Sequence, residues 1–586
     1  MNAPLRLGAL PEGDGTRFRV WAPAAEHVTL VLEPENRAVP LDPVSGGYFE
    51  HVVDSVSAGQ RYRVRLDDGD PLPDPASRFQ PEGVHGPSEV VNPEAFSWGD
   101  AAWGGVAQRD LVFYELHVGT FTPEGTFCAA TERLEYLRDL GVTAVELMPV
   151  ADFPGRWNWG YDGAALYAPS RAYGTPDDLR ALVDRAHGLG LAVFLDAVYN
   201  HLGPDGAYLA AFGPVFTDKH RTPWGDAINL DDDGSRGVRD LILDNALYWL
   251  REYHLDGLRL DATHALVDDS EPHLLAELSE AVAALPGPRR VLVAEDHRNL
   301  NTLLLPRPDG FGLDAVWADD LHHLVRNIVA GDTEGYYADF ADATTADIAE
   351  TVERGWFYDG RPSKTTAKPR GTSADPIRPA QCVVCIQNHD QIGNRPAGDR
   401  LPDSVEPAAY RAASALLLFA PELPLLFMGQ EWAATAPFQF FTDHNAELGP
   451  LVSAGRRSEF EDFPGFGGAV PDPQDASTFE RSRLDWDERE APGHAHTLAL
   501  YHALLALRRD LPDGVEAEAH GERGLHVRRG AYHLLLSFAD DVALPLPDGA
   551  VVLHTEQHEF AADPLPPEVA DGTLRFTRPG AVLVRT

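Results

Sequence analysis

Hydrophobic and polar residues alternate with a period of two over the first part of the chain. From residue 1 to about residue 97, runs such as TRFRVWAP and RYRVRLD are separated by clusters of Gly, Pro and Asp. This alternation is typical of β-strands that bury one face, and such clusters are typical of turns. The Pro-rich segment 71–87 cannot form a helix or a central strand, so it marks a linker. We predict an N-terminal β-sandwich over residues 1–97.

Between residues 98 and 510, short apolar runs alternate with segments of helical period. Segment 175–190 shows this period, with Thr175 as the cap, acidic residues in the first turn and glycine at the end. The apolar runs that predict parallel strands are 112–118, 144–150, 191–201, 257–262, 291–297, 314–320, 381–390 and 423–431. Eight strands that alternate with helices favour a (β/α)8 barrel with insertions over an open doubly wound sheet, which would carry a glycine-rich phosphate loop.

The last part of the chain returns to strand patterns. After a helix that we predict to end near Arg509, residues 511–586 contain runs such as GLHVRRG and YHLLLSFA. These runs predict a C-terminal β domain joined by polar turns. The predicted fold class is multidomain: a (β/α)8 barrel over residues 98–510, flanked by the N-terminal β-sandwich and a C-terminal β domain over residues 511–586.

Charge and cysteine content restrict the classes of partner. The 586 residues include 48 Lys and Arg against 91 Asp and Glu, a formal net charge of −43. This excess of negative charge argues against nucleic acid and against an anionic membrane surface. Three cysteines form no disulfide framework, and neither a signal peptide nor a long apolar run is seen, so we expect a cytoplasmic protein without a membrane partner. Nothing in the sequence indicates its oligomeric state.

The stretch LDGLRLDATH (255–264) brings a cation and a carboxylate to one face of a strand. Leu258 and Leu260 alternate with Arg259 and Asp261, so the two pairs point to opposite faces. An inward-facing charged pair is costly in a strand covered by helices unless the charges are paired or used. The pair is therefore either a buried structural ion pair or part of a functional site.

Polar residues also follow the other strands. After the third, fourth, fifth and seventh strands come Asp196, Asn200 and His201, Arg259 and Asp261, Glu295, and Asn388, His389 and Asp390. In a barrel of this kind, the chemistry takes place at the C-terminal ends of the strands. One carboxylate, or a single histidine, would be weak evidence. Three carboxylates without metal-ligand spacing favour paired-carboxylate chemistry over metal-assisted hydrolysis, and glycoside hydrolysis needs such a pair. We expect no metal and no cofactor, and we interpret the acidic run 231–233 as solvated.

Four motifs carry a resemblance to a known family. DAVYNH (196–201), DGLRLDATH (256–264), AED (294–296) and QNHD (387–390), in this order, resemble the conserved regions of the α-amylase superfamily of glycoside hydrolases. The resemblance implies Asp261 as nucleophile, Glu295 as general acid/base and Asp390 as transition-state stabiliser. It also implies that Arg259 keeps the nucleophile ionised. The residues that it implies around the −1 sugar are Tyr161, Asp196, His201 and His389.

The aromatic segment WNWGYDG gives two expectations. At least one of Trp157 and Trp159 should only close the barrel mouth, whereas Tyr161 should stack on a sugar ring.

Further segments narrow the resemblance to one subfamily. ADFPGRWNWGYDG (151–163), DATHAL (261–266), AEDHRN (294–299) and DTEGYYADF (332–340) are together similar to the subfamily that releases trehalose from maltooligosyltrehalose. This similarity implies retaining hydrolysis of the α-1,4 bond next to the terminal trehalose. Our candidates for recognising the trehalose part, in the loops after strands four and five, are His264, Asp296 and Arg298.

Two alternatives remain open at this point. The second candidate family is that of the 1,4-α-glucan branching enzymes, which share the N-terminal module and the general layout. A catalytically inactive carbohydrate-binding relative is the third possibility. It is disfavoured because Asp261, Glu295 and Asp390 are all present.

Overall fold

A closed barrel of eight parallel strands forms the centre of the computed structural model, which describes residues 6–460 and 470–586. The strands follow one another around the barrel in chain order, and the last pairs with the first. They are β9 (Phe113–Leu116), β10 (Ala144–Leu147), β13 (Ala192–Ala197), β16 (Gly257–Leu260), β17 (Val291–Glu295), β18 (Ala315–Trp317), β19 (Cys382–Val384) and β20 (Leu423–Phe427). The predicted barrel is confirmed, and each strand is shorter than its apolar run because the end of the run enters the following loop.

Helices alternate with these strands. They include α3 (Leu134–Leu140), α4 (Pro176–Gly188), α6 (Ser235–Glu252), α7 (Leu274–Ala283), α8 (Asp320–Ala330), α12 (Pro407–Phe419) and α15 (Pro492–Arg508). Helix α4 begins where the sequence predicts, because Thr175 and Asp178 form a capping box in which each side chain accepts the other's backbone N–H. Among the described residues, no helix has both the length and the apolar character needed to cross a membrane.

The inside of the barrel has an apolar layer and a charged layer. Alternate residues of each strand point inward, and those nearest the N-terminal ends, such as Phe113, Phe194 and Val293, form one apolar cluster. Two residues further along, the inward positions of β9, β10, β13, β16 and β17 are polar. The strand register there pairs Glu146 with Glu115, and Asp196 with Arg259. The inside of the barrel at its C-terminal end therefore carries a layer of ionisable side chains, over which the loops lie.

The N-terminal β-sandwich is also confirmed. It has two four-stranded sheets, in the orders β1-β2-β6-β5 and β4-β3-β7-β8, packed around one apolar cluster. Its strands are β1 (Gly8–Glu12), β2 (Gly15–Trp21), β3 (Val28–Glu33), β4 (Arg37–Pro40), β5 (Asp42–Val44), β6 (Tyr48–Asp54), β7 (Arg61–Leu66) and β8 (Ser88–Glu89).

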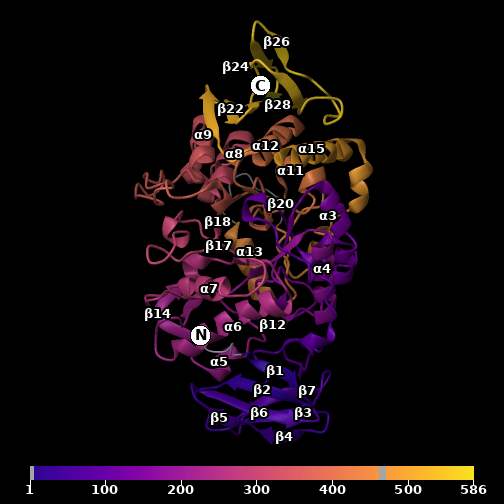
Figure 1. The fold of residues 1–586 in the computed structure, drawn as a ribbon, viewed down its shortest axis with the longest axis vertical. Coiled ribbons are helices and arrows are strands. Elements are labelled where there is room, and N and C mark those ends of the chain that lie inside the picture. The colour runs from indigo at the N-terminus through magenta and orange to yellow at the C-terminus, as the bar shows by residue number, and fades with distance from the viewer. Residues whose placement is uncertain (1–5, 461–469) are drawn as a thin grey trace.

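The C-terminal region consists of a five-stranded and a three-stranded sheet. Its strands are β21 (Glu516–His520), β22 (Gly524–Arg529), β23 (Tyr532–Ser537), β24 (Val542–Pro545), β25 (Ala550–His554), β26 (Glu568–Ala570), β27 (Thr573–Phe576) and β28 (Gly580–Arg585). Figure 1 shows the two β modules at opposite ends of an elongated molecule, with the barrel between them. The domain boundaries at residues 97 and 510 stay a prediction.

Candidate active site

Arg259 is the centre of the charged layer. Strand β16 places its side chain inside the barrel, where it is fully buried (0% exposed). Its Nη1 donates to both carboxylate oxygens of Asp196, at 2.8 and 2.7 Å, and to Oδ1 of Asp261 at 2.7 Å. Its Nη2 lies 3.3 Å from Oε2 of Glu295, and its Cζ lies 4.4 Å from the centre of the Trp317 ring. One guanidinium thus joins three of the carboxylates at the strand ends.

Asp261 is held in one orientation. Arg259 bonds one carboxylate oxygen, and the side-chain amide of Asn200 donates to the other at 2.6 Å. The side chain is largely buried but lines a cavity of about 680 Å³. A carboxylate positioned by two donors and open to a cavity is suited to attack an electrophilic carbon there.

Glu295, at the end of β17, lines the same cavity. Its Oε2 accepts the backbone N–H of Ala262 at 2.5 Å, which the turn after Asp261 directs toward it by placing Ala262 in the left-handed region (φ 40°). Burial, reinforced by the negative charges of Asp261 and Asp390, raises the pKa of Glu295 to about 8 against the opposing effect of Arg259. The carboxyl is therefore protonated at neutral pH and can act as an acid.

His389 and Tyr161 extend the network across the barrel. The hydroxyl of Tyr161 donates to Asp196 at 2.5 Å and lies 2.7 Å from Nε2 of His389, on whose ring the tyrosine stacks. The other ring nitrogen of His389 lies 2.5 Å from Oε1 of Glu115. Burial acts against the imidazolium, but Glu115 and Asp390 raise the pKa of His389 to about 9, so the ring is charged near pH 7.

Asp196 is enclosed by this network. It is almost completely buried, and its oxygens accept from Arg259 and Tyr161. Burial raises its pKa to about 6. We therefore revise its predicted role from direct sugar contact to positioning of Arg259 and Tyr161.

Two inward-facing glutamates were not selected from the sequence. Glu115 orients His389, whereas Glu146 is buried and forms no hydrogen bond through its carboxyl oxygens within the described residues. Burial, together with the charges of Glu115 and Asp196, raises the pKa of Glu146 well above its ordinary value. The sequence did contain a sign of these two residues. Each of the apolar runs FYEL and AVEL includes one glutamate, at a position where the strand alternation points the side chain into the barrel.

Aromatic rings stand around the first cavity. His201 is held by a contact of Nε2 with the backbone oxygen of Tyr161 at 2.8 Å, and its ring stacks on Trp224. Trp224 belongs to the turn between β14 (Phe216–Thr222) and β15 (Gly225–Ile228), is half exposed, and was missed because no strand-end pattern marks it. Trp157 and Trp159 are buried, and each indole N–H donates to a backbone carbonyl. Trp157 has the predicted structural role, and Trp159 also borders the cavity.

The three candidates for trehalose recognition separate in the structure. His264 lines the first cavity, and its buried Nδ1 has no hydrogen-bond partner among the described residues. Arg298 lines a second cavity of about 820 Å³, which also contains Tyr336 and Arg370. Asp390 lines both cavities, so they meet at the carboxylates.

Asp296 requires a correction. It is 1% exposed, and its oxygens accept from Arg298 at 2.8 and 2.6 Å and from the hydroxyl of Thr263 at 3.1 Å. Its carboxylate faces these donors and lines neither cavity, because the chain after β17 also directs the backbone N–H of Arg298 to Oδ1, at 3.1 Å. Asp296 therefore positions Arg298 and is not available to a sugar.

Two groups of side chains among the described residues have the spacing to hold a metal ion. They are Glu518, His520 and His526 in the C-terminal region, and His220, Asp231 and Asp269 beside the β14–β15 hairpin. The second group corrects the interpretation of segment 231–233 at one position. Asp232 and Asp233 are exposed, but the Asp231 carboxylate is not solvated, since it accepts from Lys219 Nζ at 2.8 Å and contacts His220 Nε2 at 2.9 Å. Neither group includes a residue of the cluster around Arg259.

Comparison with known proteins identifies relatives along most of the chain. Residues 90–215 match the family model of the alpha amylase catalytic domain, and residues 6–79 match that of carbohydrate-binding module 48 (isoamylase N-terminal domain). The chain is 51% identical to the malto-oligosyltrehalose trehalohydrolase of Deinococcus radiodurans, over 86% of this chain and 83% of that protein. It is 44% identical to the protein of the same name from a Rhizobium species, over 94% and 95% of the two chains.

A solved structure supports the same relationship. A putative alpha amylase from Salmonella typhimurium matches with a TM-score of 0.90 and 38% identity, and the match covers 99% of both chains. A 1,4-alpha-glucan branching enzyme from Corynebacterium jeikeium is 35% identical, but that match covers only 44% of this chain and 39% of the other protein. The branching-enzyme alternative therefore has the weaker and more partial support.

Proposed function

The chain belongs to the malto-oligosyltrehalose trehalohydrolase family within the α-amylase family of glycoside hydrolases, and we propose that it hydrolyses the α-1,4 bond next to the terminal trehalose of maltooligosyltrehalose. The products are trehalose and a maltooligosaccharide. One observation carries the chemical part of this proposal: a protonated carboxyl, Glu295, and an oriented carboxylate, Asp261, line the same cavity and contact the same guanidinium.

The proposed mechanism has two steps and retains the configuration of the anomeric carbon. In the first step Glu295 gives its proton to the glycosidic oxygen while Asp261 attacks the anomeric carbon, so that trehalose leaves and a glycosyl ester forms. In the second step the Glu295 carboxylate takes a proton from water, and the water oxygen attacks the same carbon and breaks the ester. Asp390, which is exposed to both cavities, is placed to stabilise the positive charge on the sugar ring.

The surrounding residues divide into contacts and supports. We assign sugar contacts on the −1 side to Tyr161, His201 and His389, and we assign Arg259 the role of holding the nucleophile in its ionised form. On the plus side, His264 and Arg298 are the proposed contacts with trehalose. A cytoplasmic location and the absence of nucleic-acid and membrane partners stay predictions from charge and cysteine content.

A single incubation tests the reaction. Maltooligosyltrehalose should yield free trehalose and a maltooligosaccharide by product chromatography, whereas a maltooligosaccharide of equal length should be cleaved far more slowly. Equal kcat/KM on both substrates would contradict trehalose selection but not hydrolysis. New α-1,6 branches in a linear glucan would instead support the branching enzyme.

The pH dependence should report the acid. Because Glu295 must hold a proton to start the reaction, kcat/KM should be highest below its pKa and fall as the pH rises through about 8. Asp390→Asn removes a negative charge that raises this pKa, so the falling limb should move to lower pH in the variant. A limb that stays in place in Asp390→Asn would contradict the assignment of Glu295.

Arg298→Ala tests trehalose recognition. Arg298→Ala removes a proposed charge-assisted hydrogen bond to a sugar hydroxyl. The ratio of kcat/KM on maltooligosyltrehalose to kcat/KM on a maltooligosaccharide should therefore fall by about tenfold or more. General α-1,4 cleavage should change less. Arg307→Ala is a matched control, since this arginine follows the same strand but lines neither cavity. If both variants changed the substrate preference equally, or if Arg298→Ala left it unchanged, Arg298 would not be a contact for trehalose.

A further inference from the structure

A third cavity, of about 800 Å³, lies at the opposite end of the barrel from the carboxylates. Residues that precede the strands β9, β10, β17, β19 and β20 line it, so it lies under the N-terminal ends of the strands. The end of helix α15 and Arg529 of strand β22 complete the wall. The cavity therefore lies at the junction between the barrel and the C-terminal region.

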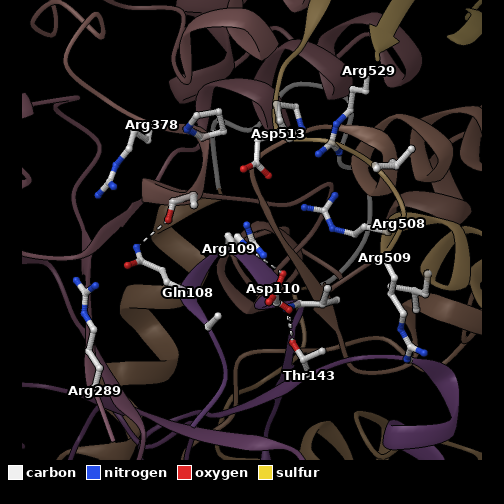
Figure 2. Close-up of a pocket in the computed structure, with 18 residues that line it drawn as sticks. Gln108, Arg109, Asp110, Thr143, Arg289, Arg378, Arg508, Arg509, Asp513 and Arg529 are labelled. Carbon is white, nitrogen blue, oxygen red and sulfur yellow. Dashed lines mark hydrogen bonds and ion pairs between the residues drawn. The ribbon is translucent and has the colours of Figure 1, made fainter. Parts of the chain in front are cut away.

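The lining of this cavity is strongly basic. It contains two aspartates, Asp110 and Asp513, and six arginines: Arg109, Arg289, Arg378, Arg508, Arg509 and Arg529. Figure 2 shows their guanidinium groups distributed around the cavity. The chain as a whole carries a net charge of −43, so this local excess runs against its overall composition. Since salt screens distant charges beyond about 8 Å, the nearby arginines determine the potential in the cavity.

Arg508 and Arg529 carry positive charge, and neither forms a hydrogen bond with a carboxylate that lines the cavity. Arg508 Nη1 donates to the carbonyls of Leu418 and Ala420, at 3.0 and 2.6 Å, and Arg529 Nη1 to those of Phe419 and Ala420, at 2.9 and 3.1 Å. These bonds cap the C-terminal end of α12, which is a sufficient structural role for both side chains. Carbonyls carry no full negative charge, however, so the two cations remain largely uncompensated.

The titration behaviour of these groups agrees with the geometry. Burial lowers the pKa of Arg508 to about 9, with the nearby Arg529 adding to the effect, and burial lowers the pKa of Arg529 to about 10. Glu422 is a buried carboxyl whose charge acts on both arginines, and burial raises its pKa to about 8. Near pH 7 it therefore offsets only part of their charge. An anion in the cavity would stabilise both arginines.

Of the other four arginines that line the cavity, Arg378 and Arg509 have free N–H donors. Within the described residues, no hydrogen bond or ion pair holds the side chain of Arg509, and Arg378 uses only its Nε, in a 3.3 Å bond to Gln381. Both side chains are exposed, and Figure 2 shows them on opposite sides of the cavity. Arg109 and Arg289 are already paired, with Asp110 and Asp314. The free guanidinium groups are thus spaced around the cavity and not clustered at one point.

Shape and chemistry together indicate the class of ligand. A guanidinium presents two parallel N–H groups that match the oxygens of a phosphate. Val112, Pro379, Pro421 and Leu505 add apolar surface between the arginines, and the volume lies in the range of small-molecule sites. We propose that this cavity binds an organic phosphate with two or more anionic groups, which bridges the barrel and the C-terminal region.

Binding measurements test the proposal on the full chain. The probes are fructose 1,6-bisphosphate, ATP and inorganic pyrophosphate, studied by calorimetry and by the shift in Tm at low and at physiological salt. We expect saturable binding of at least one organic phosphate, a raised Tm, and tighter binding than pyrophosphate shows. The double variant Arg378→Glu, Arg509→Glu should weaken binding at least tenfold, because it removes the two free guanidinium groups and leaves the α12 cap intact.

A matched double variant separates the site from general charge effects. Arg37→Glu with Arg65→Glu changes the net charge by the same amount, in the N-terminal module and far from the cavity. It should leave binding unchanged, and both double variants should keep trehalose-releasing activity. Equal weakening by the two double variants, or sulfate binding as tightly as the organic phosphates (an adventitious ion only), would overturn the proposal. Absence of saturable binding up to about 10 mM of every probe would overturn it as well.

Discussion

Replacement of Asp261 by Asn is expected to lower kcat on maltooligosyltrehalose by about 10⁴-fold or more, because an amide cannot form the glycosyl ester. The change is nearly isosteric, so the barrel should stay folded. Its cost in stability should be modest, about 1–3 kcal/mol, since one of the donors on the carboxylate, from Arg259 or Asn200, then faces an amide N–H group. Steady-state kinetics and a thermal melt measure both effects.

Asp268→Asn is the matched control for this prediction. Asp268 is also a fully buried carboxylate paired with an arginine, Arg239, at 2.6 Å, but it lines neither of the two cavities at the carboxylates. The control should lose stability and keep its turnover. If Asp261→Asn kept turnover within about tenfold of the wild type while folded, Asp261 would not be the nucleophile.

Glu295→Gln should lower kcat by about 10²–10⁴-fold on the natural substrate, because the leaving sugar then departs without a proton. The loss should depend on the leaving group. With α-maltosyl fluoride the departing fluoride needs no proton, so the C–F bond should still break as Asp261 forms the ester. The ester should then accumulate, because no base remains to take a proton from water.

Azide provides the second readout for Glu295→Gln. Azide needs no deprotonation, so it should attack the anomeric carbon, break the ester and give an α-maltosyl azide. Glu146→Gln is the matched control: burial raises the pKa of Glu146 well above its ordinary value, its carboxyl oxygens form no hydrogen bond within the described residues, and it lines neither cavity, so the amide should preserve kcat. The retaining mechanism would be contradicted if Glu295→Gln lost as much activity on α-maltosyl fluoride as on the natural substrate. A product of β configuration would contradict it as well.

Much of the fold follows from short-range patterns in the sequence. The change from a period of two to a mixture of apolar runs and helical periods separated the β-sandwich from the barrel, because strand and helix geometry impose these periods locally. The cap at Thr175 marked the start of α4 for the same reason. The placement of Asp261, Glu295 and Asp390 after parallel strands predicted that they would meet at one end of a barrel. In the structure all three line one cavity.

Other properties depend on contacts between distant segments, and sequence patterns do not encode them locally. Asp296 looked like a sugar ligand, but the fold turns it toward Arg298 and Thr263. The raised pKa of Glu295 results from burial together with the charges of residues on other strands.

The two ends of the barrel differ most clearly in how far the sequence alone predicts their chemistry. At the carboxylate end, each group follows its own strand, so the order of strands was enough to bring the groups together. The basic cavity collects arginines from positions 109 to 529, two of which the C-terminal helix α15 and the C-terminal strand β22 carry beneath the barrel. Its positive potential exists only once those segments pack together, because electrostatic interactions depend on distance in space and not on separation along the chain.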